Sequence, residues 1–143
     1  MASAHDVARY LIRELSPLST IKLQKLVYYS QAWHLVWDDE PLFPERIEAW
    51  ANGPVVPDLF REHRGEFQRT SWKKGSIQNL TPSERGTIDE IIAFYGPQDA
   101  FYLSELTHRE QPWKEARKGL PAGARGSNEI TQASMAEYYG SLV

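Results

Sequence analysis

The chain has 143 residues, of which 41% are hydrophobic and 12% aromatic, so it is not intrinsically disordered, and we expect a single domain over residues 1–143. It contains no cysteine, which excludes disulfides, thiolate metal sites and cysteine nucleophiles and fits a cytoplasmic location. A formal net charge of −3 argues against general binding of polyanions, and no apolar run approaches the roughly 18 residues that a membrane span requires.

Two helices are predicted at the start of the chain. Residues 7–15 carry apolar side chains on one side only, and Ser16-Pro17 ends this first helix. Ser19 or Thr20 can cap a second helix that runs to about Trp37, in which apolar side chains fill almost the whole circumference. Such a helix is surrounded by other elements or covered by a partner, so we expect it to be central.

Short elements are predicted in the next stretch. Alternating side chains near residues 47–50 indicate a short strand, which can be half of a small hairpin. Asn52-Gly53-Pro54 is a turn signal, because glycine supplies a positive φ and proline fixes the next φ. A short helix follows from Pro57 to about Arg64, and residues 66–80 are predicted to be a loop with a short strand at Ile77.

Helices dominate the rest of the chain. Thr81-Pro82-Ser83-Glu84 combines an N-cap, a first-turn proline and a capping glutamate. Further helices are predicted at about residues 99–108, after Pro112 and from Thr131, with a glycine-rich loop at residues 117–128. The predicted fold is therefore mainly α, a compact bundle of about six helices with a small β-hairpin or short strands near residues 42–50 and 77.

No motif for catalysis, metal binding or a cofactor is found. His34 and Asp38 lie one helical turn apart, but no further ligand follows at a metal-binding spacing. The acidic segment 38–48 has a net charge of −4, and we favour a solvated rim over a pair of catalytic carboxylates there. We therefore predict no enzyme, no metal and no cofactor.

Residues 61–75 form a basic segment with interleaved aromatic residues, Phe67 and Trp72. Such a pattern can bind single-stranded nucleic acid through phosphate contacts and stacking. The alternative, which we favour, is a surface loop whose aromatic side chains fold back onto the core. Acidic and basic segments in one small domain fit a protein partner better than a nucleic acid.

Lys25 is the most informative single residue. On the helical wheel it falls in an apolar sector, and a buried ammonium needs a partner because its desolvation is costly. We predict a salt bridge to Glu48, with Asp58 as the second choice. The alternative is a lysine whose stem packs on the core while its ammonium reaches water.

Six short sequence motifs of unusual composition follow one another along the chain. They are Lys22-Leu-Gln-Lys-Leu-Val-Tyr-Tyr-Ser-Gln-Ala-Trp-His34, Glu40-Pro-Leu-Phe43, Ile47-Glu-Ala-Trp50, Gly53-Pro-Val-Val-Pro57, Leu106-Thr-His108 and Pro112-Trp113. In these motifs the chain resembles the Panacea domain family, the SocA-like antitoxins that are also known as phage-associated GepA-type proteins. The resemblance spans about residues 5–140 and is weakest in the two stretches predicted as loops.

The resemblance implies a mostly helical antitoxin from a two-gene toxin–antitoxin system, of a kind found in prophages. Such a protein neutralises a toxin, encoded by the adjacent gene, by direct protein contact and without catalysis. Some family members are thought to act as adaptors that deliver a toxin to a protease, which is the alternative role. Nucleic-acid binding through residues 61–75 is a weaker alternative.

Aromatic and arginine side chains often dominate the energy of protein interfaces. The candidates for partner contact are Tyr29, Trp33, Trp37, Phe60, Arg61, Arg64 and Trp72. The remaining motif residues are expected to maintain the fold, and they are Leu23, Lys25, Leu26, Tyr28, Glu48, Trp50, Gly53, Pro54, Val55, His108, Pro112 and Trp113.

Overall fold

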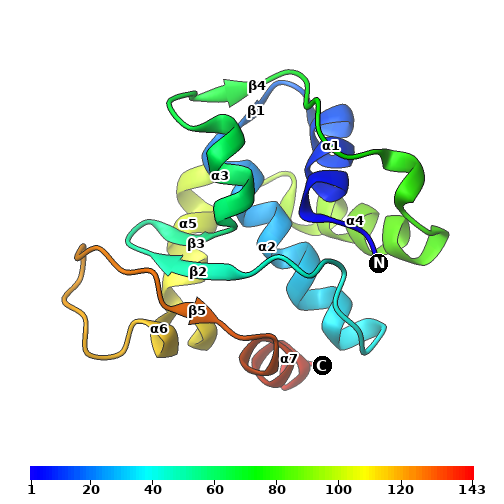
Figure 1. The fold of residues 1–143 in the computed structure, drawn as a ribbon. Coiled ribbons are helices and arrows are strands. Elements are labelled where there is room, and N and C mark those ends of the chain that lie inside the picture. Colours follow the sequence, from blue (N-terminus) through cyan, green and yellow to red (C-terminus); the bar gives the residue numbers. More distant parts are fainter.

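The computed structural model describes residues 1–143 and places helix α2 (Thr20–Trp37) at the centre of the molecule (Figure 1). Helices α1 (Ala4–Leu15), α4 (Pro82–Tyr95), α5 (Ala100–Arg109) and α7 (Gln132–Gly140) pack around it. Thirteen of the 18 residues of α2 are buried, since its apolar circumference meets a neighbour on nearly every side. The predicted central position of this helix and the mainly α fold are both confirmed.

Local sequence signals begin the helices, although α1 starts at Ala4 rather than at the predicted residue 7. Ser3 and Asp6 form a capping box on α1, and Thr81 and Glu84 form another on α4. The two short helices, α3 (Pro57–His63) and α6 (Gln111–Ala116), each have a proline in their first turn, where its missing N–H costs no hydrogen bond. None of the helices combines the length and the apolarity that a membrane crossing would require.

The strands form two small antiparallel sheets. Strand β2 (Ile47–Trp50) lies between β3 (Gly53–Val55) and β5 (Glu129–Ile130), and β1 (Leu18–Ser19) pairs with β4 (Gln68–Arg69). The predicted hairpin is therefore present, but its position along the chain was partly wrong. Gly53 and Pro54 lie in β3 opposite β2 rather than in the turn between them.

The strand predicted at Ile77 is also wrong, because Ile77–Asn79 forms a short 3₁₀ helix, η1. Its geometry depends on α1, from which the Asp6 carboxylate accepts hydrogen bonds from Ser76 N at 2.7 Å and Asn79 Nδ2 at 3.2 Å. Arg9 on the same helix donates to two carbonyl oxygens of the preceding loop. A single apolar residue in a polar stretch cannot predict these long-range contacts.

A buried carboxylate between α5 and α6 links this part of the chain to α2 and α7. Glu110, at the junction of α5 and α6, accepts hydrogen bonds from the hydroxyls of Tyr29 and Tyr139, both at 2.7 Å. The Tyr139 hydroxyl also lies 3.0 Å from that of Tyr28. Burial raises the pKa of Glu110, and the two tyrosine hydroxyls partly offset this effect.

Candidate partner-binding groove

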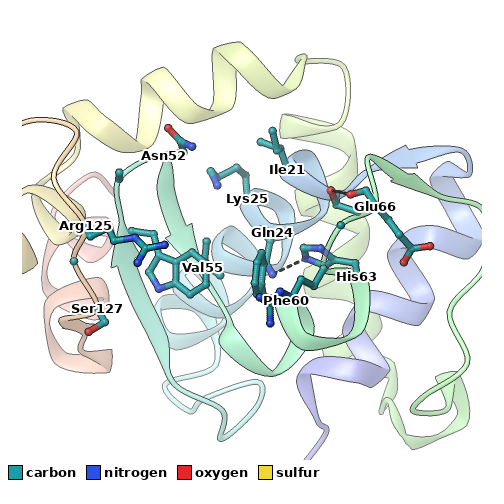
Figure 2. A pocket seen from close by; sticks show the side chains of 16 residues that line it. Ile21, Gln24, Lys25, Asn52, Val55, Phe60, His63, Glu66, Arg125 and Ser127 are labelled. Atoms are coloured by element: carbon teal, nitrogen blue, oxygen red, sulfur yellow. Dashed lines mark hydrogen bonds between the residues drawn. The ribbon is translucent and has the colours of Figure 1, made fainter.

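An open groove of about 700 Å³ lies beside the first half of α2 (Figure 2). Helix α3, the β2–β3 turn and the loop before β5 form its other walls. We name it the Lys25 groove; its lining residues are Thr20, Ile21, Gln24, Lys25, Trp50, Ala51, Asn52, Val55, Phe60, His63, Arg64, Gly65, Glu66, Arg125, Gly126 and Ser127.

Lys25 is 2% exposed and forms no salt bridge, so its predicted pairing with Glu48 or Asp58 is wrong. Its Nζ atom donates one hydrogen bond, to Pro54 O at 3.3 Å. Both oxygens of Glu48 are engaged elsewhere, by Arg46 Nε at 3.0 Å and Trp50 Nε1 at 2.9 Å. Asp58 is paired with its helical neighbour Arg61.

The missing carboxylate changes the protonation equilibrium of Lys25. Burial lowers its pKa from 10.5 to about 8, because the charged form loses hydration and gains no counter-ion. The side chain is therefore still cationic at neutral pH. The groove consequently contains an ammonium that is expensive to bury and has only one hydrogen-bond acceptor in the protein.

Gly53 provides the space that the Lys25 side chain occupies. Its φ of +128° disfavours any residue with a Cβ atom, and a Cβ there would lie 2.5 Å from Lys25 Cε. The next residue, Pro54, supplies the carbonyl that accepts from Nζ. Lys25 and Gly53, which are 28 residues apart and belong to two different motifs, therefore form one structural unit with Pro54.

A second polar pair stiffens the wall beside Lys25, and Figure 2 shows it as Gln24 and His63. Gln24 Oε1 accepts from Val56 N at 2.8 Å, and Gln24 Nε2 lies 3.0 Å from His63 Nε2. Burial lowers the pKa of His63, which favours a neutral imidazole whose Nε2 accepts from the amide of Gln24. Neither residue was predicted as a site residue, since the two are 39 positions apart and no short-range pattern links them.

The rim of the groove is aromatic and cationic. The rings of Trp50 and Phe60 meet edge to face at 4.9 Å, and Arg64 and Arg125 have no ion-pair partner. Glu66 is the one carboxylate in the lining, and it is paired with Arg69 at 3.0 Å. The lining therefore has a surplus of positive charge.

The residues predicted to contact a partner do not form one surface. Phe60 and Arg64 line the Lys25 groove, and Arg61 follows Phe60 on α3. Trp33 and Trp37 lie at the other end of α2, where their rings stack at 5.4 Å and Trp37 is 47% exposed. The set is therefore divided between two regions of the molecule.

Two of the predicted contact residues are core residues instead. Tyr29 is fully buried, with its ring stacked on that of Tyr95 at 4.0 Å, and Trp72 is 3% exposed. Neither can offer contact area to a partner in this structure. An aromatic residue on a central helix or in a loop can face either way, and only tertiary packing decides which.

Most of the other motif residues support the core or the walls of the groove. Trp113 stacks on His108 at 4.1 Å, and its Nε1 donates to Trp50 O at 2.8 Å, so it fixes the end of β2. Pro112 and Val55 are buried. Deeper in the core lie Leu23, Leu26 and Tyr28.

Three of the five cations in the basic segment 61–75 are paired with carboxylates. Arg61 pairs with Asp58, Arg69 with Glu66, and Lys74 with Glu62. Trp72 folds back onto the core, as the favoured alternative predicted, whereas Phe67 is 77% exposed. This arrangement does not present a continuous track of free cations to a phosphate backbone.

His34 and Asp38 do approach each other, with His34 Nε2 3.8 Å from Asp38 Oδ2. The other ring nitrogen of His34 lies 2.8 Å from Thr87 Oγ1. The chain contains no group of three or more histidine or carboxylate side chains that could hold a metal ion. In this structure the pair connects α2 with the start of α4.

Comparison with known families gives one match. The model of the family described as "Antitoxin SocA-like, Panacea domain" matches residues 23–114, which is more than half of the chain. This range includes Lys25, Gly53 and α3, whereas Arg125 and Ser127 lie outside it. Comparisons with curated proteins and with solved structures give no match. The chain therefore belongs to the SocA-like antitoxin family and carries its Panacea domain.

Proposed function

We propose that this protein is an antitoxin that binds a toxin protein directly and neutralises it without catalysis. The family match over residues 23–114 carries the proposal. The partner is a toxin encoded by the adjacent gene, and the two proteins meet in the cytoplasm. The toxin's own chemistry is immaterial to this role, because neutralisation requires only a contact that blocks its activity.

The Lys25 groove supports a protein partner. It combines a buried cation, two unpaired arginines and two aromatic rings, and arginine and aromatic residues are enriched at the centres of protein interfaces. A nucleic acid would instead require exposed cations in a row, but three of the five cations of segment 61–75 have carboxylate partners.

Co-expression with the adjacent gene tests the proposal. The neighbour alone should arrest growth, and co-expression of this protein should restore it. The two purified proteins should then form a complex in size-exclusion chromatography. A neighbour that is harmless alone, or that remains toxic in the presence of this protein, would contradict the proposal.

A measurement of the toxin's half-life during co-expression separates masking from delivery to a protease. We favour masking, in which the half-life of the toxin is unchanged or longer when this protein is present. If this protein is an adaptor, the half-life should shorten, and restored growth should require the host protease. A pulse-chase measurement of an epitope-tagged, catalytically inactive toxin distinguishes the two roles.

A further inference from the structure

We propose that the Lys25 groove recognises an acidic segment of the partner protein, with one Asp or Glu carboxylate bound directly to the Lys25 ammonium. This inference deepens the proposed function, on which it rests, by naming the chemistry that the bound protein must present. It follows from an incomplete hydrogen-bond shell, from the charge of the lining and from the shape of the groove.

The ammonium is held in place but is poorly satisfied. It has three N–H donors and one acceptor in the protein, Pro54 O at 3.3 Å, while the residue is 2% exposed. A buried charge is stabilised by a counter-ion and by further hydrogen bonds, and a carboxylate supplies both. Because Lys25 lines an open groove, this carboxylate can arrive from another molecule.

The neighbouring charges favour the same ligand. Arg64, after α3, and Arg125, in the loop before β5, have no ion-pair partners, and the single carboxylate in the lining is occupied by Arg69. A partner segment with a second acidic residue can reach one of these arginines at the rim. Complementary charge of this kind also excludes basic partners, because like charges in a desolvated site are strongly unfavourable.

The apolar part of the lining distinguishes a polypeptide from a free anion. Trp50 and Phe60 add aromatic surface to the lining, and Ile21 and Val55 add aliphatic surface. A small anion would leave this surface in water, whereas a peptide covers it with backbone and neighbouring side chains. Nucleic-acid phosphate fits less well, since three cations of the neighbouring basic segment, Arg61, Arg69 and Lys74, are already paired with carboxylates.

The walls are stiff enough to recognise a segment without major rearrangement. Gln24 is held by Val56 and His63, and the close packing of Gly53 on Lys25 fixes the direction of the ammonium. Preorganised donors lose little conformational entropy on binding. Recognition of a carboxylate at this position should also raise the pKa of Lys25 towards its ordinary value.

A random 12-residue peptide library displayed on phage, selected on the full-length protein, tests the inference without knowledge of the toxin. Selected peptides should carry Asp or Glu next to an apolar residue. A synthetic peptide from the selection should bind Lys25→Met at least about tenfold more weakly, with a similar loss when its acidic residue becomes Asn or Gln. Lys73→Met is the matched control, because Lys73 is exposed and lies outside the groove.

Several outcomes would overturn the inference. They are the selection of neutral or basic peptides, equal binding to Lys25→Met, and no selection above background. Inorganic phosphate and a single-stranded oligothymidine serve as competing probes. If either perturbs the Nζ signal of Lys25 in NMR spectra while no acidic peptide does so, the groove is a site for small anions or nucleic acid instead.

A co-expression experiment separates this inference from the proposed function. Lys25→Met should fold but neutralise the toxin less well, whereas Lys73→Met should behave as the wild type. If wild type and Lys25→Met protect cells equally, the antitoxin role stands and the inference is overturned. If Lys25→Met fails to accumulate, the double variant Arg64→Ala/Arg125→Ala tests the rim, and unchanged protection by it would overturn the inference.

Discussion

Replacement of Lys25 by methionine should make this protein more stable at neutral pH. Methionine has a similar length and removes the charge without leaving a large cavity. The fall in the pKa of Lys25 from 10.5 to about 8 corresponds to a penalty of about 3 kcal/mol for burying the charged form. The carbonyl of Pro54 loses its donor in the variant, which costs about 1 kcal/mol, so we expect a net gain of about 2 kcal/mol.

The gain should depend on pH in a defined direction. Between about pH 8 and pH 10.5 the unfolded chain binds more protons at Lys25 than the folded chain does. The unfolding free energy of the wild type therefore rises with pH through this window, while this contribution is absent from Lys25→Met. The advantage of the variant should be complete below pH 8 and should disappear as the pH approaches 10.5.

Urea unfolding followed by circular dichroism at pH 7, 8, 9 and 10 measures this difference, with Lys73→Met as the control that keeps the wild-type pH profile. A Lys25→Met protein that is less stable than the wild type at pH 7 would refute the reasoning. A difference that does not change between pH 7 and pH 10 would also refute it, because the lysine would then not be a desolvated cation.

Three further predictions concern other parts of the molecule. Gly53→Ala should lower the unfolding free energy by more than about 2 kcal/mol in urea titrations, because of the positive φ and the contact with Lys25; a loss under about 0.5 kcal/mol would contradict this. Because the pKa of Glu110 is raised above 4.5 in the folded protein, the unfolding free energy of the wild type should fall as the pH increases from 4.5. Glu110→Gln should not show this fall. Identical pH profiles of the two proteins would show that Glu110 does not cause it. Thr81→Ala removes the side-chain cap of α4 and should cost about 1 kcal/mol in thermal unfolding, whereas an unchanged melting temperature would show that the cap contributes nothing.

The proposed binding role of the groove gives a reason why Lys25 is present although it lowers stability. A buried lysine without a counter-ion is the kind of local conflict that proteins tolerate mainly at functional sites. The structural unit of Lys25, Gly53 and Pro54 lies entirely within the region that matches the antitoxin family. Selection for higher stability alone would favour an apolar side chain at this position.

The positions of the helices could be predicted from the sequence, because caps, prolines and apolar periodicity act within a few residues. Thr81 and Glu84 begin α4 as predicted, and the nearly complete apolar circumference of α2 indicated its central place. Such signals fail for elements that depend on distant partners. Ile77 forms a 3₁₀ turn because the carboxylate of Asp6, 70 residues away from Ser76 in the chain, binds this segment.

The candidate site was only partly predictable. The helical wheel placed Lys25 in an apolar sector, and the sequence named Phe60 and Arg64 as candidate contacts. It did not predict the groove that joins them, in which the one carboxylate, Glu66, is already paired with Arg69. Tyr29 and Trp72 show the same limit, since composition identifies aromatic residues without saying which ones reach the surface. The sequence by itself therefore determined the helices, the central helix and the family. Only tertiary structure decided which charges are paired, because ion pairing depends on distances between side chains that the chain brings together from far apart.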